Sequence, residues 1–194
     1  ITAATGINGD VTATCDVTVR RPEFSLTGDW SIIRSDPENW KLNGENSITI
    51  TTKPGEYYSN TANAENVFLT PVEGDFTATT KLTFVPGADY QTAGIIVYQD
   101  DKNLYGAYKR YHSHFNGNIF TDFALNNGSA SEHTKADPNK DAAVYLKVVK
   151  EGTTFTAYYS YDNSEWVQIA DPLNVSGLTG DLKVGLYAVD GNGK

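Results

Sequence analysis

The feature that most restricts the fold of this chain is a series of short runs in which apolar and polar residues alternate. A period of two is the period of a β-strand, whose successive side chains point to opposite faces of a sheet. The helical period of 3.6 residues is nearly absent. The runs are Ser47–Thr52, Phe76–Phe84, Gly94–Gln99, Leu104–His112, Val144–Lys150, Thr153–Tyr159, Trp166–Ala170 and Leu182–Ala188.

Residues that favour tight turns separate these runs. They are Pro54-Gly55, Glu73-Gly74-Asp75, Pro86-Gly87, Asp100–Asn103, Glu151-Gly152 and Tyr161–Ser164. Short connections of this kind join antiparallel neighbours, and many short strands joined by hairpins build a sandwich or a barrel. We therefore predict an all-β fold, a two-sheet antiparallel β-sandwich in which less than about a tenth of the chain is helical.

Length and charge restrict the partners of the chain. Its 194 residues suit one sheet-built domain of ordinary size. A formal net charge of -9 argues against nucleic acid and against anionic membrane surfaces as partners. The longest apolar runs have the length of a strand, and the single cysteine, Cys15, provides neither a disulfide nor a cysteine metal cluster. The sequence has no methionine, so we expect it to be part of a longer chain.

The first 21 residues differ from the rest. The stretch ITAATGINGDVTATCDVTVRR reads as a hairpin of Thr2–Thr5 and Val11–Val19 around Asn8-Gly9-Asp10, without a large aromatic residue. It resembles the tail of a bacterial immunoglobulin-like domain of group 2. We therefore predict a division into residues 1–21, the tail of a preceding domain or a linker, and residues 22–194, the sandwich.

No arrangement of residues in the sequence supports catalysis. Glycoside hydrolysis needs two carboxylates about 5–5.5 Å apart in retaining enzymes. The nearest candidates, Glu73 and Asp75, sit in a turn, and no third acid follows. His112 and His114 would point to one side of a strand, but a third metal ligand is not evident. We therefore expect a non-catalytic domain with no catalytic or metal-binding residues.

Residues 93–112 favour binding instead. Aromatic rings cover the C–H faces of sugars, and charged groups form hydrogen bonds with their hydroxyls. If Asp100–Asn103 forms the loop of a hairpin, Tyr98 lies opposite Tyr105 on one face, and Arg110 lies opposite Ala93 on the other. A bulge near Lys109 or a site at the sheet edge would then be needed to bring the three together. The candidate sugar-binding residues are Arg34, Glu65, Tyr98, Tyr105, Arg110 and, at the rim, His112.

A second interpretation of this hairpin stays open. Tyr98 and Tyr105 could form a cross-strand pair that stabilises the sheet without touching a ligand, because such pairs are common in sheets. The alternation does not decide which face points outward, since Ile95, Ile96 and Val97 are all apolar.

The order of several motifs resembles a known family. The motifs are Trp30-x-x-x-Arg34, Trp40-Lys-Leu42, Ser47-Ile-Thr-Ile50, Glu65-Asn-Val-Phe-Leu69, GDFTATTKLTFVPGADYQTAGIIVYQDDKNLY, VYLKVVKEGTTFTAYYSYDNSEW and LKVGLYA. Together they are similar to the concanavalin A-like (laminin-G-like) jelly-roll sandwich found at the C-terminus of family 43 glycoside hydrolases, and to family 66 carbohydrate-binding modules. The likeness covers about residues 24–188.

This resemblance implies a non-catalytic carbohydrate-binding module of a secreted bacterial polysaccharide-degrading enzyme. Its partners would be a polysaccharide or oligosaccharide and a glycosidase domain in the same parent chain, outside the cell. The alternative is an ancillary domain that packs on a family 43-like catalytic domain and completes its active site, with Ser113–Asp141 as the contributing loop. An enzyme in its own right is the third and weakest candidate. The sequence does not identify the sugar.

The resemblance also implies three structural expectations. Such sandwiches often hold a structural calcium ion, for which Asp100–Asn103, Asp137–Asp141 and Asp190–Asn192 carry suitable oxygens, although these residues also favour plain turns. A last strand typical of the family is missing after Leu182–Ala188, so either the sequence is cut short before it or Val11–Val19 takes its place at the sheet edge; we expect the second. Trp166, after the turn Ser160–Glu165, is expected to close one end of the core.

Overall fold

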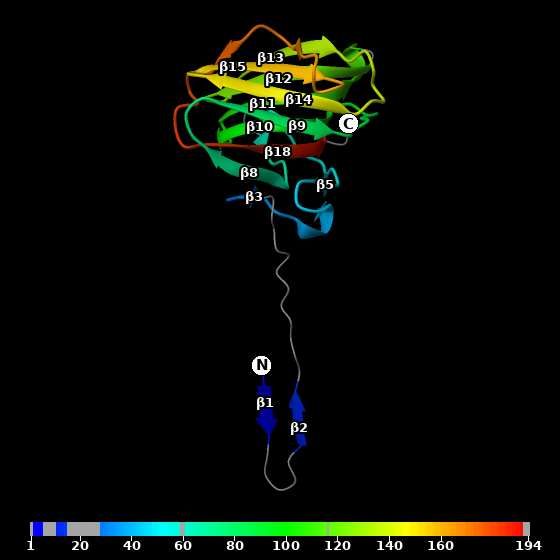
Figure 1. Ribbon diagram of the computed structural model, residues 1–194, viewed down its shortest axis with the longest axis vertical. Helices are drawn as coiled ribbons and strands as arrows, with labels where there is room; N and C mark the ends of the chain where they lie inside the picture. Colours follow the sequence, from blue (N-terminus) through cyan, green and yellow to red (C-terminus); the bar gives the residue numbers. More distant parts are fainter. Residues whose placement is uncertain (1, 6–10, 15–27, 59–60, 116, 192–194) are drawn as a thin grey trace.

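Two antiparallel sheets packed face to face form the body of the protein. The computed structural model describes residues 2–5, 11–14, 28–58, 61–115 and 117–191. Within these residues the larger sheet has seven strands. In spatial order they are β13 (Ser129–Ala136), β12 (Gly117–Asn126), β11 (Asn103–His112), β10 (Gln91–Asp100), β18 (Leu182–Asp190), β8 (Val67–Val72) and β3 (Ser31–Ile33). In Figure 1, β8 and β3 lie along the lower edge of the sandwich.

The second sheet has five strands among the described residues. Its order is β16 (Val167–Gln168), β15 (Thr154–Ser160), β14 (Val144–Glu151) and β9 (Phe76–Leu82), and β17 (Leu173–Asn174) also pairs with β15. Helical structure in the described part consists of two three-residue 3-10 turns, Pro37–Asn39 and Ser113–Phe115. Neither turn is long enough to cross a membrane. The predicted all-β, two-sheet antiparallel fold is confirmed.

The main core lies between the two sheets, where alternate residues of facing strands meet. Tyr105 of β11 stacks on Phe155 of β15, with ring centroids 4.7 Å apart, and Phe120 of β12 stacks on Tyr159 at 4.1 Å. Val97, Leu146 and Val148 belong to the same cluster of buried residues. This core takes one apolar face from each sheet, as in other face-to-face sandwiches.

The opposite face of the larger sheet, here called the outer face, carries a second cluster of buried residues. It includes Ile96, Leu104, Tyr108 and Tyr187. The segment that precedes β8 contributes Tyr57 and Ala64 to this cluster. That segment contains the small hairpins β4–β5 (Trp40–Leu42, Ile48–Ile50) and β6–β7 (Tyr57–Tyr58, Thr61–Ala62). The larger sheet is therefore apolar on both faces, which explains why alternation did not assign its outward side.

The register of the β10–β11 hairpin differs from the predicted one by one residue. Tyr98 lies opposite Leu104, Val97 opposite Tyr105, and Thr92 opposite Arg110. The ladder shifts between Tyr98 and Asp100, so one extra residue is accommodated before the loop. A shift of one residue exchanges the faces of a strand. The predicted pairing is therefore wrong: Tyr98 shares the outer face with Arg110, and Tyr105 faces the main core.

The N-terminal residues do not complete the sandwich in the way we expected. Strand β2 (Val11–Thr14) pairs with β1 (Thr2–Thr5) in a separate two-stranded sheet. The remaining residues of the predicted strand, 15–19, lie outside the described residues. The final described strand, β18, lies between β10 and β8 in the larger sheet, and its Leu182 and Tyr187 belong to the apolar clusters on the two faces.

The expectation for Trp166 also needs correction. Its ring is half-buried beside Lys147 of β14, whose Nζ lies 3.9 Å from the ring centroid. Lys147 also lies over the ring of Tyr158, at 4.8 Å. Both Lys147 and Tyr158 alternate with core residues of their strands, so this cluster covers the outside of the five-stranded sheet. Trp166 does not belong to the main core, which is filled by residues such as Ile169.

Candidate functional site

A cleft of about 490 Å³ opens on the outer face of the larger sheet. Strands β10, β11, β12, β13 and β18 provide its floor and one wall, and residues 55–57 provide part of the opposite side. The lining residues are Gly55, Glu56, Tyr57, Tyr90, Thr92, Tyr108, Arg110, His112, Phe115, Phe123, Glu132, Tyr187 and Val189. The volume lies within the usual range for small-molecule sites.

Three tyrosines form the floor of the cleft. Tyr187 meets Tyr108 and Tyr57 edge to face, with centroids 5.9 and 6.0 Å apart. Gly94 allows this packing, because a Cβ atom there would lie 2.6 Å from the Cα of Tyr108. Burial raises the pKa of Tyr108 to about 12 and that of Tyr187 well above its usual value, so both hydroxyls stay protonated. Neither hydroxyl has a hydrogen-bond partner within the described residues.

Arg110 provides the positive charge of the cleft. Its guanidinium forms an ion pair with Glu132 of β13 and lies over the rings of Tyr108 and Tyr90, at 5.5 and 6.0 Å from their centroids. The side chain of Arg110 is only 12% exposed. Its Nε is buried and has no hydrogen-bond acceptor among the described residues. The site thus holds an oriented donor and, in Glu132, an oriented acceptor.

Aromatic side chains form the rim of the cleft. Tyr90 and Phe115 are 41% and 48% exposed, which is unusual for residues of this size. The His112 ring lies between them, 5.0 Å from the Tyr90 centroid and 5.2 Å from that of Phe115. Tyr90 adopts a φ of 67°, a region that a bulky residue rarely occupies and that is concentrated at functional sites.

Two neighbours set the charge of His112. Burial lowers its pKa, and the positive charge of Arg110 lowers it further, while Asp89 opposes both effects. The Nδ1 of His112 accepts a hydrogen bond from the backbone N–H of His114 and lies 3.9 Å from Asp89. At neutral pH the imidazole is therefore uncharged and serves as a ring and hydrogen-bonding group.

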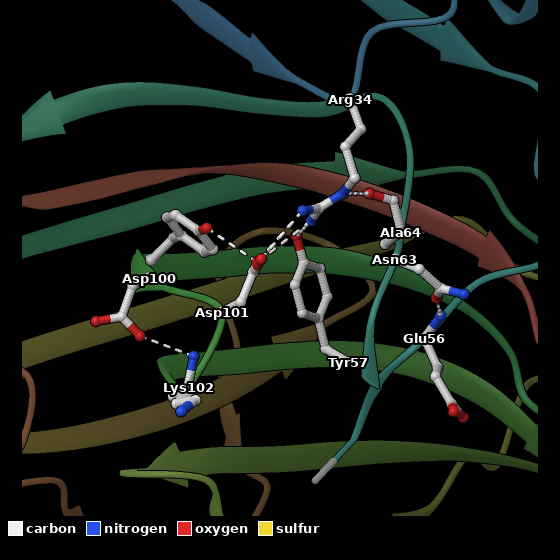
Figure 2. A network of polar contacts seen from close by, with 9 residues as sticks. Arg34, Glu56, Tyr57, Asn63, Ala64, Asp100, Asp101 and Lys102 are labelled. Atoms are coloured by element: carbon white, nitrogen blue, oxygen red, sulfur yellow. Dashed lines mark hydrogen bonds and ion pairs between the residues drawn. The ribbon is translucent and has the colours of Figure 1, made fainter. Parts of the chain in front are cut away.

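Arg34 lies in a polar network with Tyr57, Ala64 and Asp101, which connects the segment before β8 to the loop after β10 (Figure 2). Tyr98 joins this network through Asp101. The Nε of Arg34 donates to the Ala64 carbonyl at 2.6 Å, and one terminal nitrogen donates to the Tyr57 hydroxyl at 2.5 Å. The other lies 3.2 Å from Asp101, which also accepts a hydrogen bond from the Tyr98 hydroxyl at 2.9 Å. These two predicted residues belong to the same network, but both of their polar groups bind Asp101.

Glu65 belongs to a neighbouring ionic cluster. Its carboxylate lies 2.6 Å from the Nζ of Lys53, which is 2.7 Å from Asp36. Hydrogen bonds from Lys53 and Asn39 lower the pKa of Asp36. Glu65 does not line the cleft, so its position supports a role in holding the segment before β8.

Tyr105 does not belong to a binding surface, because its side chain lies in the main core. Its side chain is fully buried between the sheets, and its hydroxyl donates to Asp122 at 3.0 Å. The cause is the register shift described above, which turned this strand position inward. A ring with no exposed surface has no face to offer a sugar.

The three candidate calcium segments have other hydrogen-bond partners. Asp100 accepts from Lys102 and Asn103, as in a plain turn, and Asp190 accepts from Gln91. Residue 192 lies outside the described residues. Asp137 faces the buried ammonium group of Lys109. Across the described part of the chain, no group of three or more acidic, histidine or cysteine side chains could hold a metal ion.

Sequence reasoning found two of the residues that line the cleft, Arg110 and His112, and missed most of the others. Tyr90 and Phe115 were missed because both lie next to, rather than within, a period-two run. Tyr187 and Glu132 belong to strands distant from residue 110 in sequence, and only the sheet order brings them together. The crowding of aromatic and charged residues in residues 93–112 was the one usable signal.

Comparisons with solved structures show similar folds. The family 43 glycoside hydrolase BlXynB from Bacillus licheniformis, as its K247S mutant, superposes with a TM-score of 0.74 at 21% identity, covering 84% of this chain and 34% of that one. A xylan β-1,4-xylosidase from Bacillus halodurans C-125 gives a TM-score of 0.67 at 18% identity, covering 80% and 32%. This chain therefore spans about a third of the length of these enzymes.

A carbohydrate-binding module of family 66 from Bacillus subtilis is a further structural neighbour. It has a TM-score of 0.51 at 20% identity and covers 86% of this chain and 93% of that one. At these identities the likeness shows the fold alone. No curated protein sequence matches the chain significantly.

The family itself is shown by the sequence. The profile of the β-xylosidase C-terminal concanavalin A-like domain matches residues 22–194, which is nearly the whole chain. That profile and the antiparallel sandwich agree with the resemblance found in the motifs. The chain belongs to the family of β-xylosidase C-terminal concanavalin A-like domains.

Proposed function

We propose that the protein is a non-catalytic carbohydrate-binding module, and that its ligand lies in the cleft on the outer face of the larger sheet. One observation carries the proposal: the floor presents the hydroxyls of two buried residues, Tyr108 and Tyr187, without a protein partner in the described residues, below a rim of exposed rings. Hydroxyls that line a cleft and have no protein partner are open to a ligand that forms those hydrogen bonds.

A sugar matches this combination of groups. Pyranose and furanose rings have C–H faces that stack on aromatic rings, and Tyr90 and Phe115 offer such surfaces at the rim. The hydroxyls of a sugar both donate and accept hydrogen bonds. Arg110 can donate to them, Glu132 can accept from them, and the tyrosine hydroxyls can do either. Neighbouring cleft residues thus supply stacking and both kinds of hydrogen bond within one cavity.

The experiment begins with a glycan array on the intact chain, followed by calorimetry with the best ligand. Tyr90→Ala and Phe115→Ala are expected to weaken binding about fivefold to a hundredfold each, because each removes a stacking surface. Val167→Ala is the control, since Val167 is similarly exposed, at 40%, on the other sheet. Full affinity in both folded rim variants would place the ligand elsewhere.

The second candidate is an ancillary domain that completes the active site of a family 43-like catalytic domain. The enzymes from Bacillus licheniformis and Bacillus halodurans are about three times as long as the matched region, which supports a catalytic partner in the same parent chain. The exposed Phe115, in the turn after β11, would then contact that partner. This candidate requires that the isolated chain bind no glycan and that Phe115→Ala in the parent enzyme lower kcat/KM.

The parent protein would be a secreted bacterial enzyme that degrades polysaccharides outside the cell. The family of this domain supports a glycoside hydrolase as the parent. Its location follows only from the nature of such substrates, which are too large to enter a cell. Detection of the full-length protein in the culture medium or at the cell surface tests this part of the proposal.

A further inference from the structure

We propose that residues 137–142 form a cation-binding loop and that the ammonium group of Lys109 is its resident cation. The Nζ of Lys109 lies 3.0 Å from Asp137 Oδ2, 2.7 Å from the carbonyl oxygen of Lys140 and 3.5 Å from that of Ala142. The side chains of Lys109 and Asp137 are both fully buried. A buried lysine is rare and requires such partners.

The loop is built to present these oxygens. The other oxygen of Asp137, Oδ1, accepts hydrogen bonds from the hydroxyl of Tyr161 at 2.5 Å and from the backbone N–H of Asn139 at 2.9 Å. Its backbone N–H donates to the Asn118 carbonyl at 3.0 Å. Backbone and side-chain contacts therefore hold Asp137 in place. Within the described residues its Oδ2 has no hydrogen-bond partner, and its charge is balanced by the ion pair with the Lys109 ammonium.

The number of oxygens suits an ammonium better than a calcium ion. A lysine ammonium has three donors, and the loop offers three acceptors, one carboxylate oxygen and two carbonyls. Calcium takes six to eight oxygens at about 2.3–2.6 Å. The sequence Asp-Pro-Asn-Lys-Asp thus has the oxygen chemistry of a cation site, and Lys109 supplies the cation from within the chain.

The position of Lys109 connects this loop to the cleft. Lys109 lies on β11 between Tyr108 and Arg110, and its side chain points to the face opposite theirs. The loop follows β13, which carries Glu132, the partner of Arg110. The buried ammonium therefore fastens the two strands whose outer faces hold the ion pair of the cleft.

Cation replacement in Lys109→Ala tests the proposal. Removing the ammonium leaves the Asp137 carboxylate buried without a counter-ion, so Tm should fall by roughly 10 °C. The shortened side chain also leaves space for a small cation, so KCl or CaCl2 should restore part of the lost Tm. A large organic cation at equal ionic strength should not. Lys109→Met is the matched control, because methionine fills that space: its Tm should fall without specific recovery. The wild-type Tm should not change on adding EDTA.

A measurement on the wild-type protein keeps the test valid if Lys109→Ala does not fold. The ammonium protons of Lys109 should exchange slowly with water and give an NMR signal at neutral pH, unlike those of exposed lysines such as Lys102. The signal should be missing in Lys109→Met. Absence of a protected ammonium signal in the wild type would overturn the proposal, as would a folded Lys109→Ala that no small cation stabilises beyond the Lys109→Met control.

Discussion

The guanidinium of Arg34 lies 3.2 Å from the carboxylate of Asp101, although 67 residues separate them in sequence. The pair ties the segment before β8 to the loop between β10 and β11. The same guanidinium donates to the Ala64 carbonyl and to the Tyr57 hydroxyl, whose ring lines the cleft. One arginine therefore connects three parts of the chain, one of which lines the cleft through Tyr57.

Arg34→Ala is expected to lower the free energy of unfolding by about 1–2 kcal/mol. Hydrogen bonds to charged groups contribute more than this when buried, but the Arg34 and Asp101 side chains are 29% and 42% exposed, so solvent screens part of the interaction. Denaturant unfolding gives the value. Lys102→Ala, next to Asp101 but exposed, is the control and should have little effect. Equal stabilities of the two variants would mean that the network does not hold the segment.

Arg110→Ala is expected to weaken glycan binding about fivefold to a hundredfold in calorimetry, since it removes a charged donor from the cleft. Arg110→Lys should recover little, because lysine lacks the planar fork that pairs with Glu132 and covers the Tyr90 and Tyr108 rings. Lys81→Ala on β9 removes the same charge from the other sheet. If Lys81→Ala weakens binding as much as Arg110→Ala, the effect comes from net charge and not from the cleft.

Asp122 should make stability depend on pH. Burial raises its pKa from 3.8 to about 7, although the hydrogen bond from Tyr105 acts in the opposite direction. A carboxyl whose pKa is higher in the folded state favours folding while it is protonated. Its contribution is therefore full below about pH 4 and is lost as the pH rises through 7.

Asp122→Asn cannot ionise, so it should be more stable than the wild type at pH 8, by roughly 2–4 kcal/mol. The advantage should shrink as the pH falls and reach near zero only below about pH 4. Thermal melts of both proteins from pH 5 to 8 measure this difference. Parallel curves over the whole range would show that Asp122 does not titrate between the sheets.

Deleting residues 1–14 should leave the melting temperature of the sandwich unchanged within about 1 °C. Strands β1 and β2 pair with each other and belong to neither of the two large sheets. Removing a separate hairpin takes no hydrogen bonds from the sheet ladders that hold the core. Scanning calorimetry of the two chains measures the difference, and a lower Tm in the shortened chain would show that the hairpin contacts the sandwich in solution.

The fold and the family could be predicted from the sequence, because both depend on local patterns. Alternation in runs such as Phe76–Phe84 and Val144–Lys150 defines strands, and turns such as Glu151-Gly152 define where hairpins reverse. Each strand carries this information in its own residues. The clustering of tyrosines, Arg110 and His112 likewise pointed to the strand that forms the floor of the cleft.

Only the tertiary structure decided which face each of these residues occupies. A single extra residue between Tyr98 and Asp100 shifted the register, which moved Tyr105 into the core and placed Arg110 on the same face as Tyr98. Because strand periodicity is two, a shift of one residue reverses every side chain, and nothing in the local sequence marks it. Glu132, the partner of Arg110, lies on β13, and Asp137, the partner of Lys109, directly follows β13. β13 is two positions from β11 in the sheet, so the order of the strands determined both the cleft and the buried ammonium.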